Sequence, residues 1–366
     1  AARRALGRSR NVFRQAARIR AIFAAGKRVK FRGSHILSVT QFDRGDIQRI
    51  FRIADRMEPY AQRRRVTRVL EGAILGNMFF EASTRTRISF GSAFNLLGGE
   101  VRESVGMESL SLIKGESLQD TARVLSGFSD VICMRHPIAG SVAEFAGASR
   151  VPVLNGGDGS NEHPSQALLD LYTIEKEMAG RGRGIDGLRI AMVGDLKYGR
   201  TVHSLSKLLS LFEGVQVVLV APPELRMPPE LVEELRASGH RVEESENLEA
   251  SIAHVDIVYS TRIQEERFPD RQQADRYRGR LRLNQAIYTR HCEPNTVIMH
   301  PLPRDSRAEA NELDHDLDQN PNLAIFRQTD NGLLIRMALF ALVLDVVDAV
   351  DRYAREVPWH TPSRGG

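Results

Sequence analysis

Short apolar runs alternate with longer amphipathic segments from His35 onward. The runs have the length of β-strands, and the segments between most of them have the length of helices. Such alternation is typical of a mostly parallel sheet covered by helices on both faces, so the pattern predicts an α/β fold. The predicted strands are residues 73–80, 130–134, 151–154, 189–193, 215–220, 256–260 and 297–299.

A glycine-rich break at residues 180–184 divides this pattern into two halves. The chain has 366 residues, which is more than one ordinary core holds, so we expect two doubly wound domains, residues 35–180 and 185–330. The longest apolar stretch, residues 332–350, is interrupted by Arg336, Asp345 and Asp348. It therefore cannot be an uncharged membrane span of about 20 residues. We predict a core helix within residues 331–352, followed by a fraying tail at 353–366.

The composition changes this picture in only two respects. With 42% hydrophobic and 27% charged residues, the chain is neither disordered throughout nor fibrous. The two cysteines, Cys133 and Cys292, are too few for a disulfide framework or a cysteine-rich zinc site. A reducing, cytoplasmic compartment fits this cysteine usage best.

The net charge of +5 is unevenly distributed. Eleven of the 51 Lys and Arg residues lie in residues 1–42, which contain no acid, so 40 basic and 46 acidic residues remain beyond them, a net charge of −6. A basic patch across the folded domains, as in nucleic-acid-binding proteins, is therefore not expected. Residues 1–34 are predicted to be a mobile basic extension. A solvated extension, an organellar import segment and an anionic-surface anchor remain alternatives for it.

The most informative segment lies at the exit of the strand at 73–80. Ser83 and Thr84 open a helix that runs towards Leu97, with Gly98 and Gly99 as its stop. Backbone N–H groups at a helix start favour an anion, and the guanidinium of Arg85 matches phosphate oxygens. A helix cap with solvated arginines is the structural alternative.

Residues 83–87, Ser-Thr-Arg-Thr-Arg, resemble the carbamoyl-phosphate-binding motif of the aspartate and ornithine carbamoyltransferases. The resemblance extends over residues 35–350. It implies that Ser83, Thr84, Arg85 and Thr86 bind carbamoyl phosphate, and that the last helix packs back on the first domain. It also implies an early step of de novo pyrimidine biosynthesis, namely carbamoyl transfer from carbamoyl phosphate to the α-amine of L-aspartate.

Two further residues of the first half follow predicted strands. Arg135 comes after the strand at 130–134, and His163 precedes Pro164 at a helix start. Ligands collect at the carboxyl ends of strands in open α/β sheets. The resemblance implies that Arg135, His163 and Thr86 surround the carbonyl oxygen of carbamoyl phosphate and that Gln166 meets its amide. We expect Arg135 to keep His163 neutral, so that His163 donates a hydrogen bond.

Lys114 lies in a segment that resembles the loop that family members insert into a neighbouring subunit's active site. Lys114 would then bind both substrates, and the resemblance implies a homotrimer with shared active sites. The serine of this loop is either Ser109 or Ser111, with Ser111 preferred. Whether regulatory chains or other pathway enzymes join the assembly stays open.

Two arginines follow strands of the second half, Arg200 after 189–193 and Arg262 after 256–260. Two guanidinium groups suit two carboxylates, which aspartate offers. The resemblance places Arg200 near the α-carboxylate and Arg262 with Gln264 near the β-carboxylate, with Arg267 as support.

The residues after His300 separate the two branches of the family. The ornithine enzymes carry a Ser-Met-Gly motif and a cysteine after the corresponding histidine, whereas Pro301 follows His300 here. The resemblance also implies that the carbonyl groups of Leu302 and Pro303 accept hydrogen bonds from the N–H groups of the substrates. A structural turn would explain the prolines equally well.

The resulting hypothesis is direct attack of the amine on the carbonyl carbon, with neither a covalent enzyme intermediate nor a cofactor. We expect no metal, because His, Cys and carboxylates do not group at ligand spacing. Alternatives are transfer to ornithine or another amino acid, and a dinucleotide-binding protein, although residues 193–195 lack the three-glycine pattern. A non-catalytic binding protein that acts through the basic extension is a third.

Overall fold

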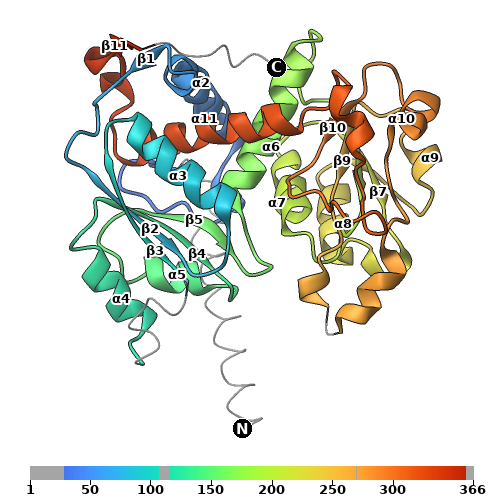
Figure 1. The fold of residues 1–366 in the computed structure, drawn as a ribbon, viewed down its shortest axis with the longest axis horizontal. Coiled ribbons are helices and arrows are strands. Elements are labelled where there is room, and N and C mark those ends of the chain that lie inside the picture. Colours follow the sequence, from blue (N-terminus) through green and yellow to red (C-terminus); the bar gives the residue numbers. More distant parts are fainter. Residues whose placement is uncertain (1–28, 107–114, 269, 360–366) are drawn as a thin grey trace. The chain divides into compact units, whose positions relative to one another are not determined.

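The computed structural model describes residues 29–106, 115–268 and 270–359 (Figure 1). These residues form two compact units. The first holds residues up to Ser165 together with those from Leu333 onward, and the second holds Gln166–Gly332. The units therefore part at Ser165 and at Gly332, whereas the sequence places the boundary at 180–184. Among the described residues, no helix is both long and apolar enough to cross a membrane.

The first unit contains a four-stranded parallel sheet in the order β3-β2-β4-β5. Helices α4 and α5 cover one face, where Ala122, Val142 and Phe145 pack against sheet residues that include Ile132 and Met134. The elements of this unit are α2 (Arg44–Ala61), β1 (Arg65–Val66), β2 (Ile74–Phe79), α3 (Thr84–Leu96), β3 (Glu100–Val105), α4 (Leu118–Leu125), β4 (Val131–His136), α5 (Ser141–Ala146) and β5 (Val153–Asp158).

The second unit contains a five-stranded parallel sheet in the order β10-β9-β6-β7-β8. The chain leaves β6 towards β7 and β8 and then returns to β9 on the other side, so the strand order reverses between β6 and β9. Ligands of open α/β sheets bind at such a reversal. The elements here are α6 (Pro164–Ala179), β6 (Arg189–Val193), α7 (Arg200–Leu209), β7 (Gln216–Val220), α8 (Pro229–Ala237), β8 (Arg241–Ser245), α9 (Leu248–Ser251), β9 (Ile257–Ser260), α10 (Gln285–His291) and β10 (Val297–Met299).

The last helix, α11 (Ile325–Val343), begins earlier and ends earlier than the predicted range 331–352. It cannot continue past Val343 in regular form because Asp345 has a positive φ of 58°. Phe340 meets Phe90 and Phe94 of α3 edge-on, with ring centroids 5.9 and 5.0 Å apart. The return of this helix to the first unit is thus confirmed.

Both ends of the described chain are more ordered than predicted. Phe31, inside the predicted extension, is buried and stacks on Phe42. Gly33 donates its N–H to the carbonyl of Val343 at 2.8 Å. Within the predicted tail, β11 (Arg355–Glu356) pairs antiparallel with β1. The ordered fold therefore starts before residue 34, within the predicted extension. It also continues past residue 353, within the predicted tail.

An ion pair anchors the glycine-rich segment to the second sheet. Buried Asp256 accepts hydrogen bonds from Arg183 Nη1 at 2.6 Å, from the Arg189 backbone N–H at 2.9 Å and from Arg189 Nη2 at 3.3 Å. Burial raises the pKa of Asp256, but the bonds from Arg183 and Arg189 outweigh it, so the pKa lies below its ordinary value. The carboxylate is therefore held ionised.

We expect Asp256→Asn to destabilise the protein by about 1.5–3 kcal/mol at pH 7, the usual range for hydrogen bonds to a charged group. A lowered carboxyl pKa stabilises the fold above the unfolded value of about 3.9, and this stabilisation disappears as the pH falls through the folded value. Urea unfolding should therefore show a difference in unfolding free energy between wild type and variant at pH 7 that shrinks as the pH falls below about 3.9. Glu246→Gln, which breaks the exposed pair with Arg226, is the control and should cost at most about 1 kcal/mol. A difference in unfolding free energy that does not depend on pH would contradict this account.

Candidate active site

The start of α3 has the features of an anion site. Ser83 is its N-cap in an extended conformation, and its side chain makes no capping hydrogen bond. The first turn carries no acidic residue. Thr86 is buried, whereas Thr84 and Arg85 are exposed. Because the first N–H groups of a helix have no partner within it, this turn offers backbone donors and a positive dipole end to an anion.

Arg135 lies beside this turn. It is paired with Phe79 across β4 and β2, and its carbonyl accepts the N–H of Phe80 at 2.9 Å. Its guanidinium forms an ion pair with Glu81 at 2.7 Å, and its side chain is only 11% exposed. Arg135 is thus brought to the start of the segment that contains Ser83, Thr84, Arg85 and Thr86.

His136, next along β4, is turned into the fold. It is buried, and its Nδ1 accepts the N–H of Ile138 at 3.1 Å. Burial lowers the pKa of His136, so its imidazole is held neutral and serves as a structural acceptor.

His163 follows β5 at the start of α6 and is buried. The preceding turn is fixed by Asp158, whose carboxylate accepts the N–H groups of Gly140 at 2.9 Å and Glu162 at 3.1 Å. Gly159 has a φ of +52°, and a Cβ there would lie 2.8 Å from the backbone N of Ala139. This close packing of the loops after β4 and β5 requires glycine and fixes the approach to His163.

Three residues of the predicted site, Lys114, Ser109 and Ser111, lie outside the described residues. Their roles, and the neutral state expected for His163, stay predictions.

In the second unit, the exits of β6 and β9 are in close contact. Gly194 has a φ of +119°, and a Cβ there would lie 2.1 Å from the carbonyl oxygen of Thr261. Buried Asp195 joins the two loops, because its carboxylate accepts the N–H groups of Tyr198 at 2.9 Å and Gln264 at 3.0 Å. Burial raises the pKa of Asp195, and these two bonds oppose that effect.

Asp195 therefore positions the loops that carry the predicted aspartate-binding residues. Arg200 is the first residue of α7 and is buried. Arg267 donates to the carbonyl of Tyr198 at 3.3 Å, so it links the loop after β9 to the loop after β6.

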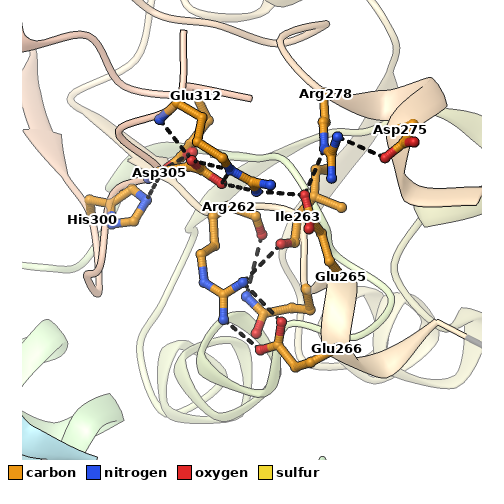
Figure 2. Close-up of polar contacts among 11 residues, drawn as sticks. Arg262, Ile263, Glu265, Glu266, Asp275, Arg278, His300, Asp305 and Glu312 are labelled. Atoms are coloured by element: carbon orange, nitrogen blue, oxygen red, sulfur yellow. Dashed lines mark hydrogen bonds and ion pairs between the residues drawn. The ribbon is translucent and has the colours of Figure 1, made fainter. Parts of the chain in front are cut away.

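The guanidinium of Arg262 already holds a carboxylate of the chain itself (Figure 2). Its Nη1 and Nη2 donate to the two oxygens of Glu266 at 3.0 and 2.5 Å, and Nη1 also donates to the carbonyl of Ile263. Burial raises the pKa of Glu266, but the pairing with Arg262 outweighs it and leaves that pKa below its ordinary value. The guanidinium of Arg262 is thus arranged to bind a carboxylate in a bidentate manner.

A second ion network lies next to it. Glu265 accepts from Arg278 Nε and from Arg307 Nη2, both at 2.7 Å, and Arg278 also pairs with Asp275 (Figure 2). Neither Glu266 nor this network was predicted from the sequence. The only local signal was the four-residue spacing of Arg262 and Glu266.

The loop after β10 is fixed by side chains as well as by its prolines. Leu302 has a positive φ of 56° and precedes a cis peptide bond to Pro303. Its N–H donates to His300 Nδ1 at 2.8 Å, and His300 Nε2 lies 2.8 Å from Glu312. The carbonyl groups of Leu302 and Pro303 are therefore presented by a rigid turn.

Each unit, taken by itself, gathers donors for an anion at the carboxyl ends of its strands. In the first unit these donors follow β2, β4 and β5, and in the second they lie at the reversal between β6 and β9. Among residues 29–106, 115–268 and 270–359, no group of three or more His, Cys, Asp or Glu side chains could hold a metal ion.

Comparison with protein families decides the assignment. Residues 34–176 match the carbamoyl-P binding domain of aspartate/ornithine carbamoyltransferase, and residues 186–343 match the Asp/Orn binding domain. The chain belongs to the aspartate/ornithine carbamoyltransferase family. The family that residues 83–87 predict is thereby confirmed.

Members of this family with high similarity carry one description. The aspartate carbamoyltransferase catalytic subunit of Saccharophagus degradans is 75% identical over 332 residues, which are 91% of this chain and 98% of that protein. The protein of the same name from Cellvibrio japonicus is 74% identical over 336 residues, covering 92% and 99% of the two chains.

Solved structures of the family agree with the α/β fold. The catalytic subunit of Methanocaldococcus jannaschii aspartate transcarbamoylase matches with a TM-score of 0.78 at 42% identity, covering 86% of this chain and 99% of that one. The Trypanosoma cruzi enzyme in complex with N-(phosphonacetyl)-L-aspartic acid matches with a TM-score of 0.77 at 38% identity, covering 87% and 98%. The predicted fold class is confirmed.

Proposed function

We propose that this chain transfers the carbamoyl group of carbamoyl phosphate to the α-amine of L-aspartate, giving N-carbamoyl-L-aspartate and phosphate. The observation that carries the proposal is the bidentate pairing of Arg262 with a carboxylate at the strand reversal of the second unit. A guanidinium so arranged suits the β-carboxylate of aspartate and would repel the cationic side chain of ornithine. The pathway is de novo pyrimidine biosynthesis.

The donor substrate is assigned to the first unit and to three residues of the second. Ser83, Thr84, Arg85 and Lys114 hold the phosphate. Thr86, Arg135 and His163 donate to the carbonyl oxygen. The NH₂ group of carbamoyl phosphate donates hydrogen bonds to acceptors on Gln166, Leu302 and Pro303. Arg200, Arg262, Gln264 and Lys114 bind aspartate.

The chemistry is direct acyl transfer. The deprotonated amine attacks the carbonyl carbon, the carbonyl oxygen gains negative charge, and phosphate leaves and accepts the amine's proton. One well-placed donor to such an oxygen lowers the barrier by about 3 kcal/mol. Positioning of the two substrates supplies much of the remaining acceleration, and the mechanism needs no cofactor.

The assembly is proposed to be a cytoplasmic homotrimer in which Lys114 reaches a neighbouring subunit's site. The curated relatives are described as catalytic subunits, which supports a place in a larger assembly with regulatory chains or other pathway enzymes. The functional domains are proposed to be residues 35–180 and 185–330.

The test is an assay of the full chain with carbamoyl phosphate and a panel of amines. We expect carbamoylation of aspartate with release of phosphate, and ornithine turnover at least about a thousandfold slower, because a site built for a second carboxylate leaves its arginines unpaired with ornithine. Mass measurement in solution tests the trimer. Comparable turnover of ornithine would contradict the proposed acceptor.

A further inference from the structure

A fully buried carboxylate, Asp170 on α6, lies behind one of the proposed substrate contacts. Its Oδ1 accepts hydrogen bonds from Gln166 Nε2 at 2.8 Å and from Gln328 Nε2 at 2.6 Å. Its Oδ2 accepts from the hydroxyl of Tyr259 at 2.7 Å. All three donors are neutral groups of the second unit, and nothing in the proposed chemistry uses Asp170 directly.

The hydrogen bonds continue from Asp170 to the loop after β10. Gln328 accepts the backbone N–H of His300 through Oε1 at 3.0 Å. His300 in turn accepts the N–H of Leu302 at 2.8 Å. Asp170 therefore connects Gln166 with the turn at Leu302, the two places proposed to receive the NH₂ group of carbamoyl phosphate.

The carboxylate also decides which way each glutamine amide faces. Because Oδ1 of Asp170 accepts from the Nε2 atoms of both glutamines, each glutamine turns its NH₂ group towards the carboxyl group and its carbonyl oxygen away. Gln328 follows this rule, since its oxygen is turned to the N–H of His300. Gln166 is only partly buried, so its oxygen on the side away from Asp170 can reach a ligand.

We propose that Asp170 is a positioning residue that orients Gln166 with its carbonyl oxygen towards the substrate. The site then presents an acceptor where the carbamoyl group has an N–H donor and where an acyl phosphate such as acetyl phosphate has a methyl group. Asp170 thereby sets the preference for a carbamoyl over an acetyl donor. This inference rests on the proposed function.

The experiment compares Asp170→Asn with wild type, using carbamoyl phosphate as substrate and acetyl phosphate as competing inhibitor. Asparagine can donate as well as accept, so it no longer fixes the Gln166 amide. We expect kcat/KM for carbamoyl phosphate to fall about 10- to 100-fold, the effect of leaving one or two polar groups mispaired, while the inhibition constant of acetyl phosphate changes less than about threefold. Equal losses for both ligands would mean a merely structural role and overturn the proposal, as would unchanged discrimination.

Tyr259→Phe is the matched control. It removes the bond to Oδ2 and leaves both glutamines on Oδ1, so the ratio between the two ligands should stay within about twofold of wild type while the melting temperature falls. Loss of the ratio in this variant would also contradict the proposal.

Two further measurements keep the test decisive. If Asp170→Asn does not fold, Asp170→Ser removes the same acceptor-only group with less bulk, and the same two constants are measured. In a Gln166→Leu background, Asp170→Asn should cause no further loss of discrimination, because both changes act through one amide. An inactive wild type would refute the proposed function, whereas an active wild type with undiminished discrimination in Asp170→Asn would refute this inference alone.

Discussion

Arg85→Ala is expected to abolish useful binding of carbamoyl phosphate. The start of α3 offers backbone donors, and Arg85 adds a full positive charge and paired donors for phosphate oxygens. Truncating one partner of a hydrogen-bonded charge pair costs about 2–5 kcal/mol, which corresponds to about a 30- to 4,000-fold rise in KM for carbamoyl phosphate. Steady-state kinetics at saturating aspartate measures it.

Arg87→Ala is the matched control for that variant, because the two arginines share the helix and differ in partners. Arg87 is bound to Glu103 of β3 at 2.5 Å, and its carbonyl accepts from Asn77. Its loss should cost some stability and leave KM for carbamoyl phosphate within about twofold, since partly exposed ion pairs contribute only about 0–1 kcal/mol. A wild-type KM for carbamoyl phosphate in Arg85→Ala would show that this turn does not bind the phosphate group.

The two arginines also show what a motif in the sequence can and cannot specify. Ser-Thr-Arg-Thr-Arg after an apolar strand was enough to predict the helix start at Ser83, because caps and strand exits are local features. The separation of roles between Arg85 and Arg87 depends on Glu103, a residue of the edge strand β3. The sequence did not predict that strand.

Two edge strands were missed for a physical reason. Residues 100–105 and 241–245 form β3 and β8, and each has a neighbour on one side only, with most of its side chains exposed. Both strands therefore lack the apolar run that identified the others, including the buried edge strands β5 and β10. The boundaries of β5 were also wrong, because the strand extends through two glycines to Asp158, beyond the predicted range 151–154.

Buried polar residues were the other part of the site that the sequence could not supply. Asp170 lies four residues after Gln166, so their contact was accessible from helical spacing. Its partners Tyr259 and Gln328 are 89 and 158 residues away, and only the fold brings them to one carboxylate. Arg336 is similar, because it interrupts an apolar helix and yet is buried, stacked over Phe90 and bonded to Ser89.

Arg262→Ala is expected to raise KM for aspartate while it leaves KM for carbamoyl phosphate nearly unchanged. The grip on Glu266 demonstrates that both prongs of this guanidinium can bind one carboxylate at once. Removing hydrogen bonds to a charged group costs about 1.5–3 kcal/mol, or about 10- to 150-fold in KM for aspartate. Aspartate titrations at saturating carbamoyl phosphate give this constant directly.

Two further variants separate the bidentate donor geometry of Arg262 from its charge. Arg262→Lys keeps the charge but loses the parallel donors, so its KM for aspartate should lie between those of wild type and Arg262→Ala. Arg278→Ala breaks the neighbouring pairs with Glu265 and Asp275 and should leave KM for aspartate within about twofold, because these carboxylates are bound by other chain residues and not by substrate. If Arg278→Ala raised this KM as much as Arg262→Ala, the effect would belong to the loop as a whole, and the β-carboxylate would have to be bound elsewhere.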